Sequence, residues 1–364
     1  MRTSRTHVAT ATLALAATGA VMTPARASAP TPTTLADNLV GPLRAAVDRH
    51  GTAYVSQNFG GPILRVKRGG EPRPIYSGDP DVEVGGVSVR NGVLTFTETV
   101  NNEEGFPSDS SLLRRDPSGK VRTVKNIWDY EAAHNPDAKV TYGLRGVSDS
   151  CAAQWPEDQF GPAVYQGVVD SHPYATLTRN ARTYIADAAM NAVISVTPRG
   201  RTRTVSVLPA VPVPVTEDLA SSLGAPDCAV GLTYYGEPVP TDIEEGRDGK
   251  LYVTTLGGGL GEQLPLGAIY RINPDNGRAT RLVKGLSAPV GLALAPHRTM
   301  YFSQLFAGTI SRVKMGSHRV RTFVETATPA EVEYRNGNLY ATINALPPED
   351  GPPAGKLVKY RLPR

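Results

Sequence analysis

One pattern recurs along the chain and constrains its fold more than any other feature. In residues 240–255 a proline is followed by a tyrosine twelve positions later, and an Asp-Gly turn lies between them. A repeat with a period of some tens of residues is typical of folds built from one supersecondary unit. The pattern recurs in further copies. It runs from Pro42 to Tyr54, Pro289 to Tyr301, Pro173 to Tyr184, Pro329 to Tyr340 and, in degenerate form, from Val84 to Thr95.

Each copy has the pattern of a four-stranded antiparallel sheet. An apolar strand leads into a turn marked by Asp-Gly, Asn-Gly or His-Gly, and an aromatic or β-branched strand returns. Asn-Gly and Asp-Gly adopt the positive φ angles that tight hairpins need. A third strand and a short outer strand follow, as in residues 268–272 and 281–284. Six such units predict an all-β, TolB-like or NHL-like six-bladed β-propeller.

The two ends of the chain complement each other. The last unit stops after its third strand, at residues 357–361, and lacks an outer strand. Residues 33–37 precede the first unit in the way that residues 281–284 precede the fifth. We therefore expect the N-terminal strand to complete the sixth blade, which leaves no long unpaired sheet edge.

The first 27 residues have the pattern of a Sec-type signal peptide. Arg2 and Arg5 precede an apolar run at 8–21, and Ala25-Arg26-Ala27 supplies small residues for cleavage after Ala27. The run is too short for a membrane span, and no later segment is apolar enough to be one. We expect a secreted protein in which residues 28–364 form a single propeller domain.

The charge of the chain argues against nucleic-acid and membrane-surface partners. The full chain has 38 basic and 34 acidic residues, a net charge of +4. Removing the leader takes away three arginines and leaves +1, with both signs interspersed. No electrostatic surface for a polyanion is expected.

Because a propeller closes without a partner, we expect a monomer.

Two insertions interrupt the repeat, at about 127–169 and 210–238. The first can alternatively hold a degenerate seventh blade, and in the second Thr216 and Gly224 predict the two caps of a short helix. Each insertion carries one cysteine, Cys151 or Cys228, and export favours a disulfide between them. Both insertions follow an outer strand, so we expect the bridge to tie them into a cover over one face.

Three segments resemble the ScyD/ScyE family of secreted bacterial propellers, which is related to NHL-repeat and gluconolactonase-like folds. These segments are His172-Pro-Tyr-Ala leading to 184–192, Val239-Pro-Thr-Asp-Ile-Glu-Glu leading to 256, and Glu131-Ala-Ala-His-Asn-Pro-Asp137. The family usually has Asn at the position of His172. The resemblance implies the propeller fold and supplies no catalytic residues.

Inner strands line the channel of a propeller, so position within each repeat identifies channel residues. Three charged residues, Arg44, Asp242 and Glu331, stand two positions after the proline, where the other copies have small residues. Glu331 should lie beside Arg44, with Asp242 across the channel. They form either a charge-paired plug between the blades or a polar ligand site, in which Asp242 and Glu331 are candidate ligands for a divalent cation.

Two further candidates belong to the third copy. His172 is a candidate metal ligand or general base, although a single His beside Pro is more often structural. Asp187 is a candidate ligand residue whose simpler role is to accept backbone hydrogen bonds. Gln57, Glu98 and Gln304 occupy the equivalent position in other copies.

Three functions remain open from the sequence. The leading one is extracellular binding of a small molecule, a glycan or a protein at the covered face, without a cofactor. The second is a metal-dependent hydrolase or lactonase, with Asp242 and Glu331 as ligands and His172 as base. The third is a structural protein of the cell wall. The sequence contains neither His-Glu-x-x-His nor Gly-x-Ser-x-Gly, and no complete catalytic set is evident.

Overall fold

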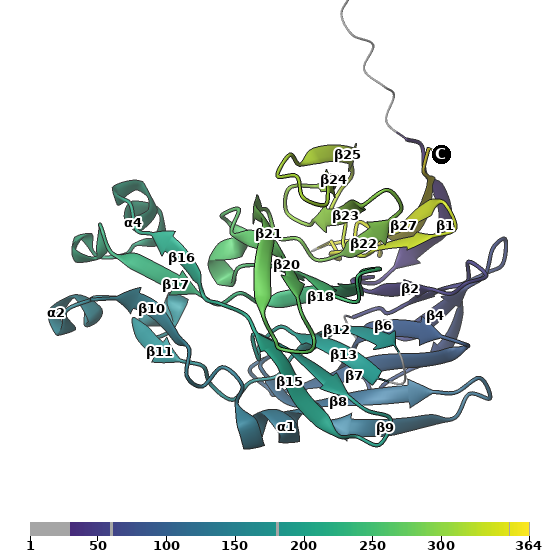
Figure 1. Ribbon diagram of the computed structural model, residues 1–364, viewed down its shortest axis with the longest axis horizontal. Helices are drawn as coiled ribbons and strands as arrows, with labels where there is room; N and C mark the ends of the chain where they lie inside the picture. The colour runs from purple at the N-terminus through teal and green to yellow at the C-terminus, as the bar shows by residue number, and fades with distance from the viewer. Residues whose placement is uncertain (1–29, 59–60, 180–181, 349, 364) are drawn as a thin grey trace, which may run out of the picture.

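A computed structural model describes residues 30–58, 61–179, 182–348 and 350–363. The predicted signal peptide lies outside these residues. The chain forms seven four-stranded antiparallel sheets, an arrangement that fits a β-propeller (Figure 1). Among the described residues, no helix has the length and apolar character needed to cross a membrane.

Five of the sheets each use four strands that are consecutive in the chain, with the innermost strand first. They are β2–β5 (Ala45–Val47, Ala53–Val55, Ile63–Val66, Arg73–Tyr76), β6–β9 (Val82–Arg90, Val93–Asn101, Pro107–Arg115, Val121–Asn126), β12–β15 (Pro173–Arg179, Arg182–Asp187, Ala192–Val196, Thr202–Val207), β18–β21 (Pro240–Glu245, Leu251–Thr255, Gly267–Ile272, Ala279–Leu286) and β22–β25 (Leu292–Ala295, Thr299–Gln304, Thr309–Lys314, Arg321–Glu325).

The two ends of the chain share the next sheet. Strands β26 (Val332–Arg335), β27 (Asn338–Ile343) and β28 (Gly355–Arg361) form three of its strands, and β1 (Thr33–Leu39) pairs antiparallel with β28. The predicted closure by the N-terminal strand is therefore confirmed. The side chains of Ala36 and Leu39 are buried in the core between this sheet and β2–β5.

The innermost strands of these six sheets contact one another in a closed circuit. Strand β2 contacts β6, β6 contacts β12, and the series continues through β18, β22 and β26 back to β2. A separate buried apolar cluster fills the space between each pair of neighbouring sheets. Each sheet alternates its side chains between two faces, and both faces pack against a neighbour.

The hairpin turns that the repeat predicted have the expected backbone. Asn91 and Gly92 have φ angles of 52° and 76°, and Asn336 and Gly337 have φ angles of 49° and 78°. Two consecutive positive φ angles suit the right-handed twist of the paired strands. These turns connect β6 to β7 and β26 to β27.

The seventh sheet combines strands from the two insertions. Its order is β11-β10-β17-β16, with β10 (Thr141–Arg145) and β11 (Val164–Gln166) from the first insertion and β16 (Val211–Pro214) and β17 (Thr233–Gly236) from the second. Short helices accompany it: α2 (Asp149–Ala152), α3 (Glu157–Phe160), α4 (Glu217–Leu223) and the 3-10 turn Asp227–Ala229. We call residues 141–166 and 211–236 the arm.

The arm has its own core and the predicted cross-link. Trp155, Val215 and Tyr234 are buried in a cluster with Cys151, which is bonded to Cys228. Helix α4 has the predicted caps: Thr216 accepts from the N–H of Leu219, and Gly224 has a φ of 65°. The core reaches the ring through Leu260, which belongs to the 3-10 turn Gly259–Glu262 between β19 and β20.

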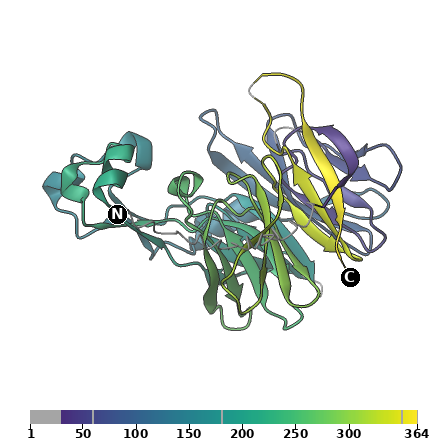
Figure 2. The same ribbon diagram turned by 90° about the horizontal axis from the view of Figure 1, so that it is seen from above.

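The predicted cover over one face is wrong. Figures 1 and 2 show the arm projecting sideways from the ring, with α2 and α4 far from the innermost strands. The physical reason is that the two insertions pair with each other as a sheet and bury their apolar side chains in the arm. Helix α1 (Ile127–His134) is the part of the first insertion that packs on the ring, next to β8.

Candidate functional site

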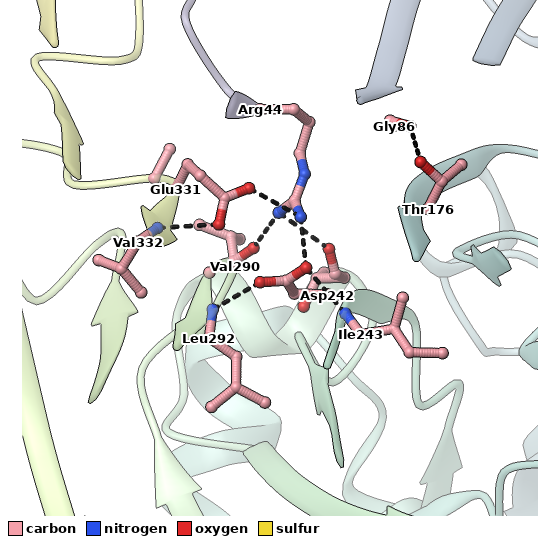
Figure 3. A network of polar contacts seen from close by, with 12 residues as sticks. Arg44, Gly86, Thr176, Asp242, Ile243, Val290, Leu292, Glu331 and Val332 are labelled. Carbon is pink, nitrogen blue, oxygen red and sulfur yellow. Dashed lines mark hydrogen bonds and ion pairs between the residues drawn. The ribbon is translucent and has the colours of Figure 1, made fainter. Parts of the chain in front are cut away.

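The centre of the ring holds a buried ion-pair network around Arg44. Arg44 precedes β2, Asp242 lies in β18, and Glu331 precedes β26 (Figure 3). Arg44 Nη2 contacts Asp242 Oδ1, and it lies 2.8 Å from Glu331 Oε2. Arg44 Nη1 donates to the carbonyl oxygen of Val290 at 2.7 Å. The structure thus brings together the three charged residues that the repeat placed in the channel.

Both carboxylates of this network also accept backbone hydrogen bonds. Asp242 accepts from the N–H groups of Ile243 at 2.8 Å and Leu292 at 2.6 Å, and Glu331 accepts from Val332 at 2.9 Å. The three charged side chains are at most 4% exposed. Buried charges are tolerated where they are paired and hydrogen-bonded, as here. We call Arg44, Asp242 and Glu331 the plug.

The electrostatics of the plug favour one positive charge between two carboxyl groups. Burial alone would lower the pKa of Arg44, but Asp242 and Glu331 raise it above its ordinary value. Burial raises the pKa of Glu331 well above its usual range despite Arg44, and Asp242 adds to the rise. Arg44 therefore stays charged, and Glu331 holds a proton more readily than an ordinary glutamate does.

The plug does not suit a divalent cation. The guanidinium of Arg44 contacts both candidate ligands, and backbone N–H groups occupy further lone pairs of the same carboxylates. A metal ion would have to displace this buried cation. In the part of the chain that the structure describes, no three Asp, Glu, His or Cys side chains form a group that could hold a metal ion.

The positions equivalent to the plug residues in the other repeats, two residues after the proline position, hold small residues. Close packing of the innermost strands explains why. A Cβ atom on Gly291 would collide with the backbone of Ala330 and Glu331. The Thr176 hydroxyl donates to the carbonyl oxygen of Gly86 on the neighbouring innermost strand (Figure 3). The ring is therefore too narrow at this level for six large side chains.

A cavity of about 330 Å³ adjoins the plug within the channel. Its lining includes the plug residues together with Glu244 in β18 and Glu333 and Arg335 in β26. Side chains two positions apart in a strand point to the same face. Glu244 therefore follows Asp242 along the channel, and Glu333 follows Glu331. We call this cavity the channel pocket.

The two carboxyl groups of the pocket have no partners of their own. Among the described residues, no ion pair and no hydrogen bond is made by the side chain of Glu244 or Glu333, and both are partly exposed. Burial raises the pKa of Glu333 to about 7 against the opposing effect of Arg335. Burial and then Glu333 raise the pKa of Glu244 well above its ordinary value.

Sequence reasoning missed Glu244 and Glu333 because it considered a single level of the channel. The signal was present in the alternation Asp242-Ile-Glu244 and Glu331-Val-Glu333, which places two carboxyl groups per strand on one face. Arg335 continues the same face of β26. Its Nε is buried and has no hydrogen-bond partner within the described residues.

The other side of the plug is apolar. Leu43, Val290 and Ala330, which precede plug-level positions, belong to a buried cluster that also includes Leu305. Tyr174 packs against this cluster, and the guanidinium carbon of Arg44 lies 5.6 Å from the centre of its ring. The plug therefore separates this apolar cluster from the acidic pocket.

The structure pairs His172 with Glu83. His172 Nε2 lies 3.0 Å from Glu83 Oε2, and Glu83 Oε1 accepts from Asn58 at 2.8 Å. Burial would lower the pKa of His172, but Glu83 raises it, and His172 in turn helps to lower the pKa of Glu83. Glu83 therefore favours the protonated imidazole, and His172 can act as a general base only in its neutral form.

Asp187 and the equivalent residues mostly bind the backbone. Asp187 accepts from the N–H groups of His172 at 2.8 Å and Met190 at 3.1 Å, and from the hydroxyl of Ser171. Gln57 accepts from Val40 N–H and Gln304 from Ser287 N–H. Glu98 instead accepts from the hydroxyl of Tyr76.

A buried carboxyl group lies between α1 and the sheet β12–β15. Glu131 is fully buried, and neither of its oxygens has a hydrogen-bond partner among the described residues. Burial raises its pKa to about 8, and the negative charges of Asp187 and Asp137 contribute. In the sequence, Glu131 stands out only as part of the segment 131–137 that resembles the ScyD/ScyE family.

Fold and channel together define the chain as a β-propeller protein, and comparison with known proteins supports that class. No protein-family model matches the sequence, and no curated protein sequence matches it. Solved structures do match: virginiamycin B lyase from Staphylococcus aureus has a TM-score of 0.51 and 15% identity, covering 92% of this chain and 99% of that chain.

Two further solved structures show the same similarity. The PQQ-bound aldose sugar dehydrogenase from Streptomyces coelicolor has a TM-score of 0.55 and 13% identity, with 93% of this chain and 99% of that chain covered. A nidogen/laminin complex has a TM-score of 0.50 and 12% identity, with 80% and 84% covered. At these identities the similarity establishes the fold, and one fold supports many activities.

Proposed function

We propose that this chain is a secreted, six-bladed propeller of the ScyD/ScyE type that binds a small polar molecule in its channel pocket. The observation that carries the proposal is the cavity of about 330 Å³, into which the partnerless carboxyl groups of Glu244 and Glu333 project. Small-molecule sites combine a concave shape with a few convergent polar groups. This pocket has both properties.

The count of six blades is supported by the closed circuit of innermost strands. Six sheets contribute to that circuit and are separated by six apolar clusters. The seventh sheet contributes no strand to it and has a core of its own. We infer that the seventh sheet is an accessory arm rather than a blade.

Secretion is supported by two independent features. The N-terminal 27 residues have the charge, apolar run and small residues of a signal peptide. The bond between Cys151 and Cys228 is of the kind that persists in oxidising compartments.

Binding is favoured over metal-dependent hydrolysis by the bonding of the candidate catalytic groups. Asp242 and Glu331 are committed to Arg44, and His172 is committed to Glu83. The groups with free bonding capacity are those of the channel pocket. A purely structural role does not explain why two carboxyl groups without partners face a cavity.

The proposal is tested by thermal shift against a panel of sugars, amino sugars, polyols, amino acids and small amines. We expect at least one compound to raise Tm of the wild type by about 5 °C at a hundredfold excess over Kd. Glu325→Gln is a matched control, because Glu325 is an exposed carboxylate on the outer strand β25. The control should respond like the wild type, and the double variant Glu244→Gln/Glu333→Gln should not.

Two results would overturn the proposal. One is that no member of the panel shifts Tm of the wild type. The other is that the double variant responds to every active compound as strongly as the control variant does. Circular dichroism of the double variant checks that it is folded before its response is interpreted.

A further inference from the structure

We infer that the ligand of the channel pocket is a compact organic cation that also carries hydroxyl groups, with its positive charge held between Glu244 and Glu333. The inference rests on the proposed function, because it names the chemical class of the ligand for the same pocket. It follows from the charges around the cavity, their lack of partners and the volume of the cavity.

The charges around the pocket are unbalanced toward negative. Five carboxyl groups line the cavity, those of Asp242, Glu244, Glu245, Glu331 and Glu333, together with the three arginines Arg44, Arg247 and Arg335. Arg44 is already bound to Asp242 and Glu331. The unmatched groups are the pair Glu244 and Glu333, which is the pair that a cationic ligand would satisfy.

The groups at the rim leave Glu244 and Glu333 without a bonded cation. Glu245 is bound by Arg179, with a distance of 2.5 Å between Arg179 Nε and Glu245 Oε2. Arg247 also lines the cavity, and no described acidic group pairs with it. Arg335 lies near enough to lower the pKa of Glu333, yet it forms no ion pair with it among the described residues.

The donors in the pocket indicate that the ligand also presents oxygen atoms. The guanidinium groups of Arg247 and Arg335 form no ion pair within the described part of the chain. Both residues line the cavity. Hydroxyl oxygens of a ligand can accept from these donors, while its ammonium group donates to the carboxylates. An amino sugar or an amino alcohol has this combination.

The volume restricts the ligand to a small molecule. About 330 Å³ is at the low end of the range for small-molecule pockets, so a single sugar ring fits better than an oligosaccharide. A bare metal ion would leave most of that space unfilled, and the plug at its end is already neutralised by Arg44.

Proton exchange provides a second signature. Burial raises the pKa of both Glu244 and Glu333, and Glu333 raises the pKa of Glu244 further, so both groups hold a proton more readily in the free protein than ordinary glutamates do. A cation favours the ionised forms, so its binding should release protons and strengthen as pH rises. The plug carboxylates remain bound to Arg44, so we assign the released protons to the pocket pair.

The experiment compares two pairs of probes that differ in charge but hardly in shape: glucosamine with glucose, and 4-amino-1-butanol with 1,4-butanediol. Isothermal titration calorimetry is run on the full mature protein at pH 5.5 and pH 6.5, where both amines are mainly protonated, in two buffers of different ionisation enthalpy. We expect the cation of at least one pair to bind about tenfold or more tightly than its neutral partner. We also expect proton release, and tighter binding at pH 6.5 than at pH 5.5.

The variants separate the inference from the proposed function. Glu244→Gln/Glu333→Gln should lose the preference for the cation and the proton release, while Glu325→Gln should retain both. If in each pair the neutral compound binds as tightly as the cation, the ligand class is wrong and pocket binding stands. If none of the four probes binds, the ligand class is also rejected, and the wider panel decides whether the pocket binds anything.

Discussion

Arg44 and Asp242 are 198 positions apart in the sequence, and the guanidinium of one contacts the carboxylate of the other at the centre of the ring. Arg44 immediately precedes the innermost strand β2, Asp242 lies in the innermost strand β18, and Glu331 joins them from just before β26. The network therefore links three sheets whose innermost strands are far apart in the sequence. Loss of one partner should affect the whole ring rather than one sheet.

Arg44→Met should destabilise the protein strongly. The substitution keeps an unbranched side chain but leaves two buried carboxyl groups without their cation, a change that typically costs about 3–5 kcal/mol. Urea unfolding of the mature protein measures this loss. The triple variant Arg44→Met/Asp242→Asn/Glu331→Gln should recover part of the stability, because it removes the unpaired charges. A single variant as stable as the wild type would show that the plug contributes little.

Glu131→Gln should change how stability depends on pH. The pKa of Glu131 rises from 4.5 to about 8 in the folded protein, so between these values the folded state holds a proton that the unfolded chain releases. The stability from this group is therefore full below pH 4.5 and is lost as pH rises through 8. Gln resembles the protonated form and does not titrate.

We therefore expect Tm of the wild type to fall more than Tm of Glu131→Gln when pH is raised from 6 to 9. Scanning calorimetry at several pH values measures the difference. Asp129→Asn is a control, because Asp129 is an exposed carboxylate on the same helix and should leave the wild-type profile unchanged. Parallel profiles for the wild type and Glu131→Gln would contradict a raised pKa for Glu131.

The sequence predicted the ring better than it predicted the arm, for a physical reason. Ring strands repeat a local pattern in which each hairpin has its own turn signal, so position in the repeat located Arg44, Asp242 and Glu331. The arm pairs β10 with β17, which come from separate insertions and follow no repeat. Pairing between distant segments leaves no periodic signal, so neither this sheet nor its sideways direction could be predicted.

The candidate site, like the fold, was predicted only in part. The plug followed from one position per repeat, whereas the pocket required the next position on the same strand face. The positions of Glu244 and Glu333 could be predicted, because residues two positions apart in a strand lie on the same face. The absence of partners for them could not, because it depends on how Arg335 and Glu245 are oriented in the folded chain.

Removal of the disulfide should loosen the arm and leave the ring intact. Cys151 and Cys228 are 77 positions apart, and closing a loop of this size is worth about 4 kcal/mol in the chain-entropy model. Because the arm has its own core, Cys151→Ser/Cys228→Ser should speed amide exchange in β10 and β17. Exchange in β13 and β14 should stay slow. Equally faster exchange in all four strands would show that the bridge stabilises the ring as well.

The closure by β1 predicts a sharp contrast between two neighbouring positions. Ala36 is 6% exposed and packs in the core between the last sheet and β2–β5, whereas Thr34 on the same strand is exposed. Ala36→Asp would bury an unpaired carboxylate and should displace β1, which uncovers the edge of β28. We expect Ala36→Asp to lower Tm by roughly 5 °C or more and to promote aggregation, and Thr34→Asp to leave both nearly unchanged. Light scattering during thermal unfolding measures both effects. If the two variants behave alike, pairing of β1 with β28 does not protect this edge.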